Sequence, residues 1–126
     1  MPPAQLFVRY WLPVIVYALL IVSISSIPIR IQHVPFRYYD KVFHFVEYGL
    51  YVWLWYRALK GTGRFRGYGW AGISAFLICV AFGILDEFYQ SYIPYRVSDL
   101  YDLAADASGS LVMISLTLLK DFFKQP

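Results

Sequence analysis

Two stretches without a charged side chain decide the fold, residues 11–28 (WLPVIVYALLIVSISSIP) and residues 67–85 (GYGWAGISAFLICVAFGIL). A helix needs roughly 20 mostly apolar residues to cross a bilayer, and each stretch comes close to that length. Pro13 and Pro28 lie near the two ends of the first stretch, where a proline disturbs a helix least. We therefore expect both stretches to be membrane-spanning helices.

The composition of the whole chain supports a membrane protein. Of its 126 residues, 60% are hydrophobic and 15% are charged, whereas a typical soluble domain has roughly 25% charged residues. The high aromatic content, 21%, excludes a disordered chain, and the lone Cys79 excludes a disulfide scaffold. The net charge of +3 is too small to indicate a nucleic-acid partner.

Two further stretches, residues 40–59 and 99–119, are also long enough to span a bilayer. The first half of each carries charged residues, which makes a soluble loop the obvious alternative. The charges recur at helical spacing, however, so we predict helices. The predicted fold is a single all-α domain over residues 1–126, an integral membrane four-helix transmembrane bundle. Its predicted spans are approximately 11–28, 40–59, 67–93 and 99–119.

The distribution of basic residues predicts the orientation of this bundle, because cytoplasmic loops are enriched in Lys and Arg. One side would hold seven basic residues: Arg9, Arg57, Lys60, Arg64, Arg66, Lys120 and Lys124. The other side would hold four: Arg30, Arg37, Lys41 and Arg96. We therefore expect both termini in the cytoplasm. A cleaved signal peptide is the alternative for the first stretch, but its length favours a retained helix.

Seven of the eight acidic residues lie between positions 40 and 106, and they fall on the predicted outer side. Three predicted helices carry polar stripes whose spacing puts each stripe on one helix face. The stripes are Asp40, His44 and Glu47; Asp86 and Gln90, with Glu87 adjacent; and Asp99, Asp102 and Asp106. Facing lipid would cost about 2.5–3.5 kcal/mol per charged residue near a helix centre. We therefore expect the stripes to line a polar pocket that opens on the extracytoplasmic side.

Each of these residues also has a plainer interpretation. A stripe of acids at a water interface is often only a solvated rim, and Asp40 and Asp99 open helices as ordinary N-caps do. His44 has the alternative of a structural histidine, and Arg96 that of an anchor for lipid headgroups. The segment 105–109, with a small residue at each end, indicates close helix packing rather than chemistry.

Two segments are similar to the VanZ-like family of small bacterial membrane proteins. The first, residues 40–50 (DKVFHFVEYGL), resembles that family's D-K-x-x-H-F-x-x-Y pattern. The second, residues 86–109, contains D-E-x-x-Q, then P-x-R, then three acids and a glycine, in the order of the family. Two positions depart from the family: Tyr95 replaces a frequent Gly, and Asp106 replaces a frequent Asn. The extra carboxylate at Asp106 favours a bound cation.

The resemblance implies a role in the cell envelope, in the bacterial inner membrane. The family takes its name from a protein associated with teicoplanin resistance, so the material acted on or bound would be lipid-linked or part of the cell wall. The lipid bilayer is the expected partner, with a lipid-linked or glycopeptide ligand, and nucleic acid is not expected.

Two functions fit the predicted pocket. The first is a metal-assisted enzyme, in which Arg96 holds a phosphate or another anionic group and a divalent cation assists the reaction. Its expected catalytic residues are His44, Glu47, Asp86 and Glu87; its expected substrate-binding residues are Lys41, Gln90, Arg96 and Tyr48; its expected metal ligands are Asp99, Asp102 and Asp106. The alternative is a non-enzymatic binder, or a component of a proton-linked transporter, for which a homodimer would supply the missing half.

Overall fold

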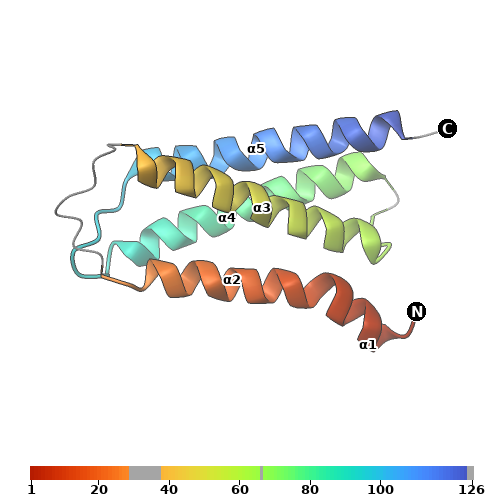
Figure 1. Ribbon diagram of the computed structural model, residues 1–126, viewed down its shortest axis with the longest axis horizontal. Helices are drawn as coiled ribbons and strands as arrows, with labels where there is room; N and C mark the ends of the chain where they lie inside the picture. Colours follow the sequence, from red (N-terminus) through yellow and green to blue (C-terminus); the bar gives the residue numbers. More distant parts are fainter. Residues whose placement is uncertain (29–37, 66, 125–126) are drawn as a thin grey trace.

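The computed structural model describes residues 1–28, 38–65 and 67–124, and its regular elements are all helical (Figure 1). The predicted all-α fold is confirmed. The first helix is continuous through α1 (Pro3–Leu6), η1 (Phe7–Trp11) and α2 (Leu12–Ser25). It is followed by α3 (Tyr39–Gly61), α4 (Tyr68–Gln90) and α5 (Leu100–Phe123). Arg30, Arg37 and Arg66, which contributed to the predicted orientation, lie outside the described residues.

Three of these helices are long and apolar enough to cross a membrane, namely Pro3–Ser25, Tyr68–Gln90 and Leu100–Phe123. Helix α3 has 23 residues, as α4 does, but it falls short in apolarity within the described part of the chain. Its charged residues and its many Tyr and Trp side chains lower the mean hydropathy. The chain is thus a helical membrane protein, and a fourth span through α3 stays a prediction.

The first helix begins at Pro3, well before the predicted start at Trp11. The predicted span left out Arg9 because of its charge, but one arginine near a helix end can extend its guanidinium to the membrane interface. The turn at Phe7–Trp11 is a wider π-turn, in which the Leu12 N–H donates to the Phe7 carbonyl. Pro13 follows it and has no N–H to continue the normal ladder, which accounts for the irregularity at this point.

Helix α3 lies in the middle of the bundle and packs most extensively on α5. Tyr48, Tyr51 and Val52 of α3 are almost completely buried. The closest approach of the two helices is at Gly109, where an added Cβ would lie 2.0 Å from the carbonyl oxygen of Phe45. A side chain at position 109 would therefore force the two backbones apart. This contact agrees with the packing that the small residues at 105–109 predict.

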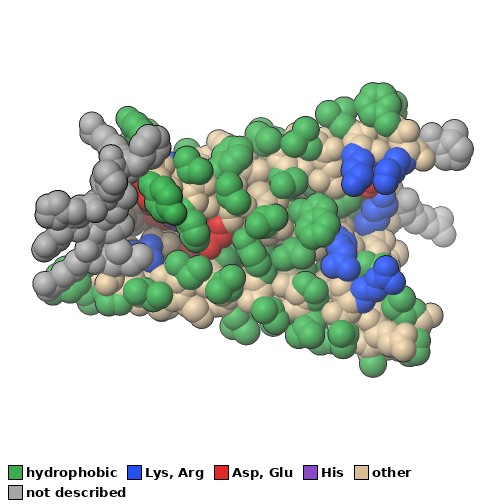
Figure 2. Space-filling model, viewed as in Figure 1, with side chains coloured by type: hydrophobic (Ala, Val, Ile, Leu, Met, Phe, Trp, Pro, Cys, Tyr) green, Lys and Arg blue, Asp and Glu red, His purple; other side chains and the backbone are tan. Residues whose placement is uncertain are grey.

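The two ends of the bundle differ in charge. The start of α1 and the end of α5 lie at one end of the bundle, and the end of α2, the start of α3 and the α4–α5 connection lie at the other (Figure 1). Lys and Arg side chains gather at the end that holds the termini, whereas acidic side chains are visible toward the opposite end (Figure 2). Between the two ends, many hydrophobic side chains lie on the face shown, as on a surface in contact with lipid.

Candidate functional site

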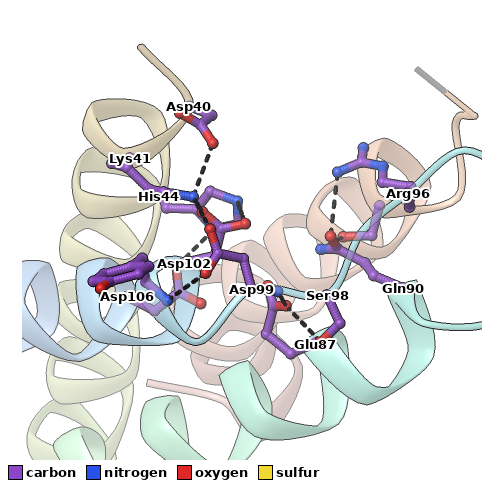
Figure 3. Close-up of polar contacts among 12 residues, drawn as sticks. Asp40, Lys41, His44, Glu87, Gln90, Arg96, Ser98, Asp99, Asp102 and Asp106 are labelled. Atoms are coloured by element: carbon purple, nitrogen blue, oxygen red, sulfur yellow. Dashed lines mark hydrogen bonds and ion pairs between the residues drawn. The ribbon is translucent and has the colours of Figure 1, made fainter. Parts of the chain in front are cut away.

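The predicted site residues come together at the end of the bundle opposite the termini (Figure 3). The side chains converge because α3 and α5 begin at this end, while α4 finishes there. Helix α3 supplies Lys41, His44, Glu47 and Tyr48; α4 supplies Asp86, Glu87 and Gln90; the connection and α5 supply Arg96, Asp99, Asp102 and Asp106. The three polar stripes therefore face one another rather than lipid.

Lys41 is the centre of the outermost group. Its ammonium donates to Asp40 at 2.9 Å, to Asp99 at 2.8 Å and to Asp102. Asp99 is also the N-cap of α5, because its carboxylate accepts the N–H of Tyr101 at 2.9 Å. Asp40, in contrast, lies within the first turn of α3 and does not cap it. The Lys41 contact, with the Tyr101 N–H, holds the pKa of Asp99 below its usual value of 3.8.

His44 lies one turn deeper, between two carboxylates of α5. Its Nδ1 lies 2.8 Å from Oδ1 of Asp106, which is a hydrogen bond, and its Nε2 lies 3.8 Å from Oδ2 of Asp102. All three side chains are more than nine-tenths buried. A histidine held in this way by carboxylates keeps a fixed orientation and tautomer, as both a general base and a metal ligand require.

Asp86 anchors a second group, between α2 and α4. Its Oδ2 accepts the Ser25 hydroxyl at 2.8 Å and the side-chain amide of Gln90 at 3.0 Å. The same amide donates to the Ser25 hydroxyl at 3.1 Å. Sequence reasoning missed Ser25, because it treated the first helix as a purely apolar span. The available signal was a serine within that apolar run, since Ser in a membrane helix often bonds across to a neighbour.

Arg96 joins the α4–α5 connection to the end of α2. Its Nε donates to the Ile27 carbonyl at 3.2 Å and its Nη2 to the Ile24 carbonyl at 2.7 Å. Its Nη1 donates to the Gln90 side chain at 3.3 Å. The guanidinium thus fixes the connection in place, and it retains two further N–H donors for an anionic group.

Glu87 of α4 binds the two residues that precede α5. Its Oε2 accepts the Ser98 hydroxyl at 3.2 Å and the Asp99 N–H at 3.1 Å. Ser98 is a second residue that sequence reasoning missed, and its exposed position just before a helix offers no specific signal beyond that of a turn residue.

Several buried oxygens of this cluster have no hydrogen-bond partner among the described residues. They are Oδ1 of Asp86, Oε1 of Glu87, Oδ2 of Asp106 and the hydroxyl of Tyr48. Leaving a buried polar atom unpaired is costly, so such atoms in a native structure call for a ligand, an ordered water or a proton. The surplus of negative charge makes this requirement stronger. Seven carboxylates lie at this end of the bundle, and among the described residues there only Lys41 and Arg96 carry a permanent positive charge.

His44, Glu87 and Asp106 form a compact set of metal-ligating groups. One ligand atom from each lies within 4.8 Å of the others, and all three residues are buried. This set shares only Asp106 with the predicted ligands. Asp99 and Asp102 are drawn to the Lys41 ammonium instead, which already supplies the positive charge that a metal would bring.

A cavity of about 240 Å³ opens beside these groups. Its polar lining residues come from four segments, and they are Ser25 of α2, Asp40, His44 and Glu47 of α3, Gln90 of α4 and Arg96 of the α4–α5 connection. No described side chain donates a hydrogen bond to the carboxylate of Glu47, which is buried in the cavity wall. Tyr48, predicted to bind substrate, is completely buried in the core and does not line this cavity. Of the seven acids at this end, Asp40 and Glu47 line the cavity and the other five do not.

Comparison with known proteins identifies one family. The model of the VanZ/LLP1 family matches residues 5–121, which is nearly the whole chain. No curated protein and no solved structure matches the sequence significantly.

Proposed function

The chain belongs to the VanZ/LLP1 family, and from that premise we propose that it is a cation-dependent enzyme of the bacterial cell envelope. It would act on a lipid-linked or cell-wall substrate that carries a phosphate or a similar anionic group. In this proposal α3 is the fourth span, both termini are cytoplasmic, and the cavity opens on the outer side of the inner membrane.

One observation carries the proposal: His44, Glu87 and Asp106 converge from three helices beside a cavity, with two buried carboxylate oxygens unpaired. Imidazole and carboxylate together form the usual ligand set of catalytic divalent ions. A bound cation would also offset the surplus of buried negative charge, which is otherwise expensive to maintain. A divalent ion at this position would polarise a phosphoryl or carbonyl oxygen and lower the pKa of a bound water.

The remaining cavity residues have separate roles in this proposal. Glu47, which lines the cavity without a described hydrogen-bond donor, is placed to accept or deliver a proton. Arg96 and Gln90 present N–H groups to an anionic part of the substrate. Lys41 and Asp86 act through their neighbours, since their contacts hold α5 and α2 in position.

The alternative is a non-enzymatic binder or a component of a proton-linked transporter. This alternative is favoured because the two described cations at this end already have partners within the protein. Lys41 contacts three carboxylates, and Arg96 contacts α2. Carboxylates and a histidine within a helical bundle are also the groups that relay protons in carriers.

The first test is metal binding by the purified full chain in detergent. We expect a stoichiometric divalent metal, and a rise in Tm on adding Mn²⁺ or Zn²⁺ to chelator-treated protein. Glu87→Gln and Asp106→Asn should abolish the rise, whereas Asp40→Asn, an acid at the rim, should retain it. Asp99→Asn separates the two ligand sets: loss of the rise in this variant, with the rise retained in Glu87→Gln, would favour the ligands predicted from sequence. Absence of any metal and any shift would contradict the proposal.

The second test separates the enzyme from the binder. Lipid phosphates in detergent micelles serve as substrates, with release of inorganic phosphate as the readout. We expect Glu47→Gln to reduce kcat by about 100-fold or more while the bound metal is retained. A protein that holds its metal and binds the lipid phosphates without turning any of them over would favour the binder.

A further inference from the structure

A second cavity lies at the opposite end of the bundle, between α3 and α5. It has a volume of about 630 Å³, and Tyr10 of η1 closes one side of it. Four basic residues line it: Arg57 and Lys60 of α3, Lys120 of α5, and Lys124 just beyond α5. We propose that this basic groove binds the phosphate headgroup of an anionic phospholipid. The proposal does not depend on the function proposed above, because the two sites share no residue.

The charges of the basic groove are only partly neutralised within the protein. Asp121 is the one acid on its wall, and it already accepts Lys60 at 2.5 Å and the Tyr56 hydroxyl. Among the described residues, no ion pair or hydrogen bond satisfies Arg57, Lys120 or Lys124. Three cations from two helices therefore surround one concavity, a geometry that suits a single phosphate better than a scattered surface charge does.

Arg57 is held in position for this role by aromatic rings. Its guanidinium lies 5.3 Å from the centre of the Tyr10 ring and 5.9 Å from that of Trp53. Stacking of this kind leaves the N–H edge of the guanidinium available for bidentate contact with phosphate oxygens. The cation is thus preorganised, which lowers the entropy lost on binding.

The other wall of the basic groove is apolar and continues along the bundle. Met113 and Leu116 of α5 and Trp53 of α3 line it, and Trp53 and Leu116 are substantially exposed. Positive charge at the interface with an apolar strip beside it matches the two halves of a phospholipid, a headgroup and an acyl chain. A free phosphate ion would use only the charged half.

The test is lipid retention by the purified full chain, measured by native mass spectrometry with phosphatidylglycerol and phosphatidylcholine supplied together. We expect the wild type to retain phosphatidylglycerol at least tenfold over phosphatidylcholine, since each cation near an anionic surface contributes about fivefold in affinity. The triple variant R57Q/K120Q/K124Q should lose most of this preference. The matched control is Arg64→Gln, which removes a cation from the same end of the bundle but outside the basic groove.

Equal loss of preference in the triple variant and in Arg64→Gln would overturn the proposal, because it would mean that the charge of the whole end acts diffusely. Equal retention of the two lipids by the wild type would also overturn it. If the triple variant fails to fold, the single variants Lys120→Gln and Lys124→Gln replace it, each with an expected loss of about fivefold. Displacement of the lipid by millimolar inorganic phosphate alone would contradict the role of the apolar wall.

Discussion

The acidic end and the basic end of the bundle hold their charges in opposite ways. At the acidic end, the carboxylates of Asp86, Glu87 and Asp106 are at least nine-tenths buried and tied to specific partners. At the basic end, Lys60 and Lys120 extend into the surroundings. The ion pair described there, Lys60 with Asp121 at 2.5 Å, has a lysine side chain that is nearly half exposed.

This difference in burial indicates at which end the exact position of a charged side chain affects the stability of the protein. A buried charge is stable only with partners at the right distance, so a small displacement of one helix is expensive. An exposed charge is screened by water and salt, and its neighbours can move with little cost. Substitutions of the same type should therefore have large effects at the acidic end and small effects at the basic end, and the first three predictions below pair the two ends.

The largest effect is expected for Gly109→Ala, at the contact that holds α5 against α3 below the acidic cluster. Alanine normally favours a helix, but here its Cβ would meet the Phe45 carbonyl oxygen at 2.0 Å, which the backbone can relieve only by moving. We expect a loss of about 3 kcal/mol in unfolding free energy. The control is Gly69→Ala, near the basic end, where nothing lies within 4 Å and no loss should occur. Denaturant titration in detergent measures both; equal midpoints would refute the steric argument.

Next in size is the comparison of two lysines. Lys41→Gln removes an ammonium that contacts three carboxylates, with only 23% of the side chain exposed. We expect it to destabilise the protein by about 2 kcal/mol, below the cost of breaking a fully buried pair. Lys60→Gln breaks one exposed pair with Asp121 and should cost under about 1 kcal/mol. Thermal unfolding of both variants at the same salt concentration measures the two losses. A larger loss of stability in Lys60→Gln than in Lys41→Gln would contradict the view that the buried ion pairs contribute more.

A smaller effect concerns two described residues with positive φ, one in a connection at each end of the bundle. At the basic end it is Gly63, with φ of 67°, and at the acidic end it is Tyr95, with φ of 66°. Glycine adopts this conformation freely, whereas tyrosine is strained in it. We expect Tyr95→Gly to stabilise the protein by about 0.5 kcal/mol and Gly63→Ala to destabilise it by about 1 kcal/mol. Opposite shifts in Tm check this; a loss in both variants would contradict it.

The smallest effect is the pH dependence of the Asp99 contact. Because the pKa of Asp99 is lowered in the folded protein, its contribution to stability is fully present above the ordinary value of 3.8. That contribution is lost as the pH falls through the lowered pKa. Asn still caps α5 but cannot form the ion pair with Lys41, so the Tm difference between wild type and Asp99→Asn should be constant above about pH 5 and shrink in stronger acid. A Tm difference that grows in acid would contradict a lowered pKa of Asp99 in the folded protein.

Much of the candidate site was predictable because helical periodicity is a local property. The spacing of Asp40, His44 and Glu47 puts them on one face wherever the helix lies, and the cost of exposing them to lipid requires that the face turns inward. The same reasoning correctly grouped the acids of α5. Asp99 as a helix cap was also among the interpretations that the sequence allowed, and the structure confirms it.

The partners within the site were not predictable in the same way. Lys41 was expected to bind substrate, yet in the structure it contacts Asp99 and Asp102, which are about sixty positions away in the chain. Ser25 joins Asp86 only because α2 and α4 approach each other at this end. Which carboxylate meets which cation depends on the rotation and axial position of each helix, and periodicity carries no information on either.

The sequence by itself determined that this chain is a helical membrane protein, because the apolar length of a helix and the spacing of its polar residues are set along one segment at a time. The motifs likewise indicated the family before any contact was known. Only the tertiary structure decided that Glu87 joins His44 and Asp106, while Asp99 and Asp102 turn to Lys41. The physical reason is that Gly49 and Gly109 let α3 and α5 approach at one particular register, and that register assigns the partners.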